Sequence, residues 1–173
     1  MPVLPPDADR RAAARRGFLS LAAVSGLAFL ASCAGKPVPV APGVGRDETD
    51  AVLGALNQLR KDKGLSPLSR DPAAVEAARY QAARMAKAGK MAHLLSISDS
   101  FLDRMKGGSV RLPAAENIAA GQKDAAAAYQ AWLHSPKHLE NMLGAHYTGL
   151  GVAMVANPAT GNRPYWAMVL SSG

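Results

Sequence analysis

Three side chains capable of acid–base or metal chemistry stand beside turn signals in the second half of the chain. Glu116 begins a short apolar run, His138 follows a Ser-Pro pair typical of a helix start, and His93 lies upstream after Met91 and Ala92. Neutral imidazoles bind Zn²⁺ well, and a carboxylate can complete or orient such a ligand pair. These residues are therefore candidate catalytic groups, and His93 and His138 are candidate ligands of a divalent metal such as zinc.

A structural interpretation of the same residues stays open. Each histidine could hydrogen-bond loop backbone, while Glu116 holds an N–H that would otherwise be unpaired. Two histidines and a distant glutamate are a weaker signal than a contiguous His-Glu-x-x-His motif. A serine hydrolase is excluded more readily, because the chain has no Gly-x-Ser-x-Gly motif and Ser135-Pro136 is typical of a helix N-cap and first turn.

The elements that must position these residues are a series of helices followed, at the end of the chain, by two strands. The pattern predicts a hairpin of strands at 147–156 and 165–171 joined by the turn 157–161. Apolar spacing and capping residues predict the helices, which run over 47–63, 71–89, 98–105, 123–133 and a short segment from Ser135 that carries His138 and Asn141. This order predicts an α+β domain with helices packed on a small antiparallel sheet.

Several side chains near the candidate site have structural interpretations. Trp132, Tyr147 and Trp166 could line a ligand groove, but large aromatics at helix and strand spacing more often form a core. Asn117 and Asn141 are expected to fix turns or caps through side-chain to backbone hydrogen bonds. We expect the same of Asn57 and Arg60, and we expect His134 and His146 to be exposed.

The first part of the chain, residues 1–32, has the features of an export signal. Arginines precede an uncharged run at 17–32 that is short for a transmembrane helix and ends in small residues. The stretch Arg15-Arg16-Gly17-Phe18-Leu19 resembles a twin-arginine motif, and Leu30-Ala31-Ser32-Cys33 resembles the lipobox of bacterial lipoproteins. Cys33 is the only cysteine, so an internal disulfide is excluded and acylation explains its position.

A Pro- and Gly-rich stretch at 33–46 then predicts an extended tether from that anchor to a domain at 47–173. Removal of residues 1–32 takes away four Arg and two Asp and lowers the formal charge from +7 to +5. This charge is mild, and the chain has neither the basic clusters nor the interleaved aromatics of nucleic-acid binding. No nucleic-acid partner is therefore expected. The expected location is the extracytoplasmic side of a bacterial cell envelope, with the membrane as partner through the lipid anchor.

Residues 52–170 resemble the bacterial branch of the CAP superfamily (cysteine-rich secretory, antigen 5 and pathogenesis-related 1 proteins). The markers, in order, are Leu56-Asn57-Gln58-Leu59-Arg60, Gly64-Leu65-Ser66-Pro67-Leu68, Met91-Ala92-His93, Glu116-Asn117-Ile118-Ala119, Trp132, Ser135-Pro136-Lys137-His138-Leu139-Glu140-Asn141, Tyr147-Thr148-Gly149-Leu150-Gly151-Val152 and Tyr165-Trp166. The resemblance implies an α-β-α sandwich and an extracytoplasmic location.

The resemblance also implies a cleft built on two histidines and two glutamates. His93, Glu116 and His138 match three of these positions, but Ser135 stands where the second glutamate is expected, and Glu140 lies on the wrong side of His138 to replace it. Since acid–base chemistry needs a second positioned group, the favoured function is a non-enzymatic module that binds a lipid-like or envelope ligand, or a protein partner. The alternative is a metal-assisted hydrolase or peptidase that uses the His-Glu cleft.

Overall fold

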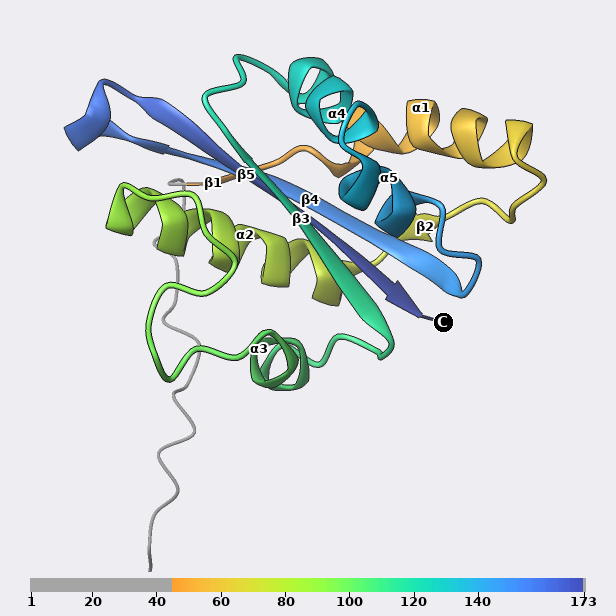
Figure 1. The fold of residues 1–173 in the computed structure, drawn as a ribbon, viewed down its shortest axis with the longest axis horizontal. Helices are drawn as coiled ribbons and strands as arrows, with labels where there is room; N and C mark the ends of the chain where they lie inside the picture. Colours follow the sequence, from red (N-terminus) through yellow and green to blue (C-terminus); the bar gives the residue numbers. More distant parts are fainter. Residues whose placement is uncertain (1–44, 173) are drawn as a thin grey trace, which may run out of the picture. The chain divides into compact units, whose positions relative to one another are not determined.

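The computed structural model of the protein describes residues 45–172. Its five-stranded sheet has the order β1-β4-β5-β3, and β2 lies off this path against β4. Helices cover both faces of the sheet, α2 and α3 on one side and α1, α4 and α5 on the other (Figure 1). This arrangement confirms the expected α+β class and the α-β-α sandwich. The export signal, Cys33 and most of the tether lie outside the described residues.

A long hairpin forms the centre of the sheet. β4 (Tyr147–Asn157) and β5 (Arg163–Ser172) pair antiparallel around a short 3₁₀ turn at Pro158–Thr160, which confirms the hairpin expected from the sequence. β1 (Gly45–Asp47) pairs antiparallel with β4, and β2 (Ser69–Arg70) pairs with it in parallel. The sheet therefore begins at Gly45, inside the stretch assigned to the tether.

The three strands outside the hairpin, β1, β2 and β3, were not expected, and β3 is the one that positions the site. β3 (Ala114–Ala120) pairs antiparallel with β5, so that Glu116 lies opposite Val169 and Asn117 opposite Met168. Asn117 is therefore a strand residue, which corrects its assignment to a turn or cap. The consequence for the site is that Glu116 is held on a hydrogen-bonded strand.

The helices are α1 (Thr49–Asp62), α2 (Pro72–Ala88), α3 (Phe101–Gly107), α4 (Ala125–Leu133) and α5 (Pro136–Met142). Side-chain caps fix most of their starts: Asp71 accepts a hydrogen bond from the Ala73 amide at 2.9 Å, and Ser100 accepts one from the Asp103 amide at 3.2 Å. α3 thus begins at Phe101, later than the expected 98. Ser135 precedes α5 as expected, but its hydroxyl makes no capping hydrogen bond.

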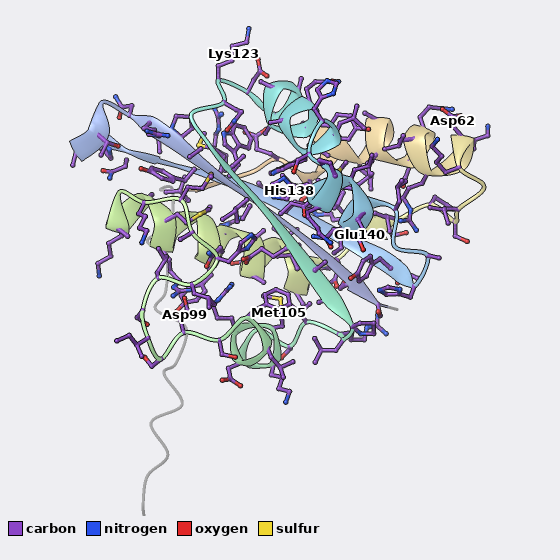
Figure 2. The ribbon with its side chains drawn as sticks, viewed as in Figure 1. Asp62, Asp99, Met105, Lys123, His138 and Glu140 are labelled. Carbon is purple, nitrogen blue, oxygen red and sulfur yellow. The ribbon has the colours of Figure 1, made fainter. Side chains whose placement is uncertain are left out.

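The sheet separates two hydrophobic cores. On the α1, α4 and α5 side, Trp132 and Trp166 are fully buried and Tyr147 nearly so, which confirms that these aromatics form a core. On the other side, Met105 of α3 packs with the alanines of α2 (Figure 2). α2 packs so closely on β4 that there is no room for a side chain at Gly151. A Cβ added there would come within 2.1 Å of the Val75 backbone nitrogen.

Two polar side chains tie the loops to this framework, as expected. Asn57 exchanges hydrogen bonds of 2.9 and 2.7 Å with the backbone of Leu68. Arg60 is fully buried and donates to the carbonyls of Ser66, Met142, Gly144 and Tyr147. The strand pairs and both cores lie within residues 45–172, so a chain of residues 35–173 contains what the domain needs to fold. None of the helices in this range is long and apolar enough to cross a membrane.

Candidate functional site

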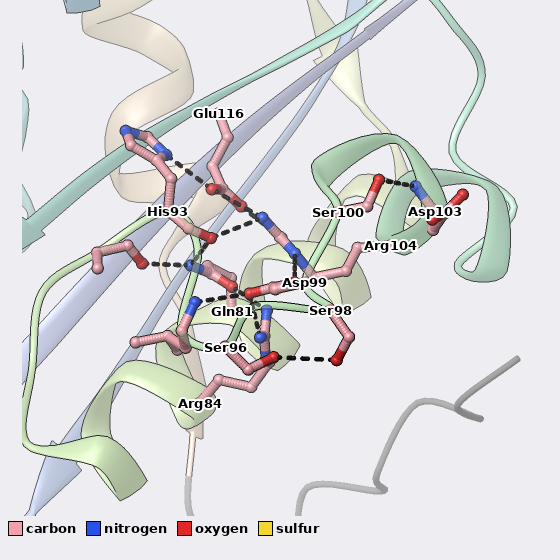
Figure 3. A network of polar contacts seen from close by, with 12 residues as sticks. Gln81, Arg84, His93, Ser96, Ser98, Asp99, Ser100, Asp103, Arg104 and Glu116 are labelled. Carbon is pink, nitrogen blue, oxygen red and sulfur yellow. Dashed lines mark hydrogen bonds and ion pairs between the residues drawn. The ribbon is translucent and has the colours of Figure 1, made fainter. Parts of the chain in front are cut away.

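Glu116 lies at the centre of a polar cluster on the α2 and α3 side of the sheet (Figure 3). Its side chain is only 2% exposed. The carboxylate accepts two hydrogen bonds from the Arg104 guanidinium, from Nη1 to Oε2 at 2.8 Å and from Nη2 to Oε1 at 3.2 Å. His93 Nδ1 lies 2.9 Å from Oε1. The Glu116 carboxylate therefore has both of its oxygens committed to protein partners.

Arg104 connects this carboxylate to the loop that carries His93. Its Nη2 also donates to the His93 carbonyl at 3.1 Å, and its Nε lies 3.3 Å from Asp99 Oδ1. Asp99 in turn forms an ion pair with Arg84 and accepts the Leu95 amide at 2.8 Å. Burial alone would raise the pKa of the Asp99 carboxyl, but the hydrogen bonds from Arg84 and Leu95 and the two nearby arginines bring it below its usual value.

Gln81 of α2 holds the same loop from the other side. Its Nε2 donates to the carbonyls of Ala92 at 2.9 Å and His93 at 3.2 Å, while its Oε1 accepts from Arg84 at 2.9 Å. Gln81 is fully buried. The backbone around His93 is thus fixed by polar contacts to α2 and α3, although it lies in neither helix.

Sequence reasoning missed Arg104, Asp99, Arg84 and Gln81. A weak signal existed for Arg104, because it lies three residues after the apolar Phe101 in the helix expected at 98–105, and residues at that spacing share one face of a helix. The guanidinium carbon of Arg104 lies 5.6 Å from the centre of the Phe101 ring. Nothing in the sequence pairs Arg104 with Glu116, since the two belong to different elements.

His138 approaches the cluster from α5 on the far side of β3. Burial lowers the pKa of its imidazole, and repulsion from His93 lowers it further, so the neutral ring is favoured. Within residues 45–172, its Nδ1 is buried without a hydrogen-bond partner. The structural interpretation expected each histidine ring to hydrogen-bond loop backbone, and the Nδ1 of His138 makes no such bond.

Two asparagines position His138. Asn117 Nδ2 donates to the His138 carbonyl at 3.0 Å, and Asn141 Nδ2 donates to Asn117 Oδ1 at 2.8 Å. Asn117 is fully buried. The pair therefore clamps helix α5 onto strand β3 through one side-chain to backbone bond and one bond between side chains. Asn141 lies inside α5, so neither asparagine has the turn or cap position expected.

The arrangement supplies few metal ligands. His93 has its Nδ1 occupied by Glu116, which leaves only Nε2 for a cation. Among residues 45–172, no group of three or more His, Cys, Asp or Glu side chains is placed to hold a metal ion. Glu140 is 70% exposed and pairs with Lys137 at 3.0 Å, so it does not take the place of the glutamate missing at Ser135. Three protein ligands are usual in a catalytic zinc site, and this donor set does not fit one.

Other candidates lie away from the cluster. Trp132 is in the core between α4 and the sheet, as expected, and it does not line a groove. His134 and His146 are exposed, as expected. The cluster is thus His93, Glu116 and Arg104, and His138 is tied to the neighbouring strand residue Asn117 through its carbonyl.

Comparison with known proteins agrees with this geometry. The model of the cysteine-rich secretory protein family (CAP) matches residues 53–170. The uncharacterised protein YkwD of Bacillus subtilis is 32% identical over 105 residues, which are 60% of this chain and 41% of YkwD. The chain thus spans less than half the length of this relative.

Two solved structures share the fold. An extracellular protein containing an SCP domain from Bacillus anthracis superposes with a TM-score of 0.63 at 27% identity, over 72% of this chain and 40% of its own. An outer surface protein from Borrelia burgdorferi superposes with a TM-score of 0.63 at 20% identity, over 74% of this chain and 98% of its own.

Proposed function

The chain belongs to the cysteine-rich secretory protein (CAP) family, and from this premise we propose that it is a non-enzymatic binding module of the bacterial cell envelope. In this proposal an acylated Cys33 holds the domain at a membrane, on the extracytoplasmic side. The cleft beside His93 and His138 takes a lipid-like envelope molecule.

The observation that carries the proposal is the state of Glu116. A general base needs a free lone pair within reach of the substrate proton, and a metal ligand needs one directed at the cation. Here the carboxylate is buried and accepts from Arg104 twice while it contacts His93. Proton transfer or metal binding at Glu116 would first have to break contacts to a buried guanidinium, so the residue has a structural role in this proposal.

The metal-assisted hydrolase or peptidase is the second candidate, and one observation favours it. Burial lowers the pKa of the His138 imidazole, its Nδ1 has no hydrogen-bond partner among the described residues, and a neutral imidazole nitrogen is a good ligand. Against it stand the absence of a third ligand among the described residues and the serine at the position of the second glutamate.

The location proposed for the protein rests on the leader and on its relatives. The lipobox-like stretch ends at Cys33, and the two similar structures come from an extracellular protein and an outer surface protein. An acyl chain would stabilise membrane attachment by roughly 0.8 kcal/mol per buried CH₂. The tether that follows would leave the cleft free to meet its ligand.

Mass spectrometry of the protein purified from its own membranes tests the proposal. We expect a mature N-terminus at acylated Cys33, and we expect Cys33→Ala to release the domain into the soluble fraction or stall its processing. Ala41→Ser, a change within the tether, is the control and should leave the attachment unchanged. An unmodified N-terminus at another residue contradicts the anchor.

Organic extraction of the same preparation tests the cleft. We expect a co-purified amphiphile whose amount falls in His93→Ala and is retained in His134→Ala, which alters an exposed histidine far from Glu116. A wild-type extract without any amphiphile contradicts the lipid-like ligand. If a protein co-purifies in place of an amphiphile and is lost in His93→Ala, the site binds a protein partner and the lipid-like ligand is contradicted.

A further inference from the structure

The segment that carries His93 also carries exposed hydrophobic side chains. Within residues 45–172, the large hydrophobics with at least 40% exposure all fall between 91 and 112: Met91, Leu94, Ile97, Leu102 and Leu112. Ile97 is fully exposed at 108%. In Figure 1 the loop after α2 and helix α3 lie together at one end of the molecule, across the sheet from α1, α4 and α5. Clustered exposure of this kind marks an interaction surface.

The loop that carries His93 is exposed although it makes several internal polar contacts. Its charged residue Asp99 is only 3% exposed in the ion pairs with Arg84 and Arg104, and Gln81 binds two of its carbonyls. The charged side chains of Asp99 and Arg104 thus point inward while large apolar side chains point outward, the reverse of the usual arrangement in a soluble protein. The buried network holds the apolar side chains on a fixed support, where no described residue covers them.

The charges around this surface indicate what covers it. The exposed charged side chains from 87 to 112 are four basic residues and one acidic residue: Lys87, Lys90, Lys106, Arg111 and Asp103. The other charged residues of this stretch, Asp99 and Arg104, are buried with each other. A surface with apolar residues flanked by basic ones complements an anionic lipid bilayer, because the apolar groups reach the acyl boundary while the cations meet phosphate.

From this combination we infer that the exposed apolar and basic side chains of residues 87–112, with His93 excluded, form a docking surface for an anionic phospholipid bilayer. Ile97 and Leu94 enter the boundary between head groups and acyl chains, and Lys90 and Lys106 contact lipid phosphates. This contact is separate from the acyl anchor and from the cleft, although it rests on the proposed function in placing the protein beside a membrane. It would orient the tethered domain with α3 toward the lipid and hold His93 close to the bilayer.

Co-sedimentation of residues 35–173 with vesicles tests the surface without the acyl chain. One set of vesicles is phosphatidylcholine alone, and the other contains about one part phosphatidylglycerol to three parts phosphatidylcholine. We expect binding to the anionic vesicles, weakened by added salt. Ile97→Asn should lower the partition coefficient about tenfold or more, since a fully exposed isoleucine loses its burial in lipid. Lys90→Gln with Lys106→Gln should lower it by about fivefold per charge.

A charge-matched pair on the opposite side of the sheet is the control. Lys61→Gln with Lys63→Gln removes two exposed charges of α1 and its end, and binding should stay within about twofold of the wild type if the docking surface alone carries the contact. No binding to anionic vesicles, or equal losses in both lysine pairs, overturns the proposal. A dimer in solution that Ile97→Asn converts to a monomer, with no vesicle binding by the wild type, also overturns it. The surface would then join two copies of the chain.

This result is distinguishable from failure of the proposed function. His93→Ala should leave vesicle binding unchanged and should lower the amount of co-purified amphiphile. Ile97→Asn should weaken vesicle binding and leave the amount of amphiphile unchanged. Loss of vesicle binding in both variants would contradict the separation of the two surfaces and with it this inference.

Discussion

Replacement of Trp132 by alanine is expected to lower the free energy of unfolding by about 3–5 kcal/mol. Trp132 is fully buried in the core formed by α1, α4, α5 and one face of the sheet. Truncation removes a large apolar surface from this core and leaves a cavity that neighbouring elements fill only in part. Urea denaturation of residues 35–173, followed by circular dichroism, measures the change.

Leu102→Ala is the matched control for Trp132→Ala. Leu102 lies in α3 and is 45% exposed, so its truncation should change the free energy of unfolding by about 0.5 kcal/mol or less. A loss near 1 kcal/mol for Trp132→Ala would contradict the core position and return Trp132 to the wall of an open groove. If the variant does not accumulate, Trp132→Phe, which retains much of the apolar volume, should be folded and less destabilised.

Glu116→Gln is expected to destabilise the protein by about 3 kcal/mol or more. The substitution leaves the Arg104 guanidinium, whose side chain is 7% exposed, without its bidentate partner. Removal of one member of a buried ion pair leaves a charge that is neither solvated nor paired, which typically costs about 3–5 kcal/mol. Asp99 remains beside Arg104 at 3.3 Å, so we expect the lower part of this range.

A double-mutant cycle identifies the cause. Arg104→Met combined with Glu116→Gln removes both charges and should cost clearly less than the sum of the two single changes. The control cycle uses Lys137→Gln and Glu140→Gln, whose ion pair has a similar 3.0 Å separation but side chains 90% and 70% exposed. That pair should contribute about 1 kcal/mol or less. Additive effects at Arg104 and Glu116 would contradict the structural role assigned to the pair.

Much of the fold could be predicted from local sequence signals. Asp71, Pro72 and Gly89 mark both ends of α2, and the structure places its helix between them. The hairpin was equally visible, because two β-rich runs flank a turn at 157–161. Such signals act between residues close in sequence, where capping and turn geometry decide the conformation.

The strand β3 could not be predicted in the same way. Its sequence, Ala114–Ala120, is mostly alanine, which has a low preference for strands. The segment becomes a strand because β5 offers it a hydrogen-bonding edge far away in the chain, with Glu116 opposite Val169. For the same reason the site was predicted only in part: His93, Glu116 and His138 were found by motif, whereas Arg104 and Asp99 join them only through tertiary packing.

Calorimetric titration of residues 35–173 with Zn²⁺ at about pH 7.5, where imidazoles are mostly neutral, tests the central claim most directly. The claim is that the His93, Glu116 and His138 cleft is a binding site whose carboxylate is committed to Arg104. It predicts no saturable heat that depends on both histidines. Saturable binding that is abolished by His93→Ala and by His138→Ala separately, and that weakens at lower pH as imidazoles protonate, would contradict it and favour the metal-assisted hydrolase.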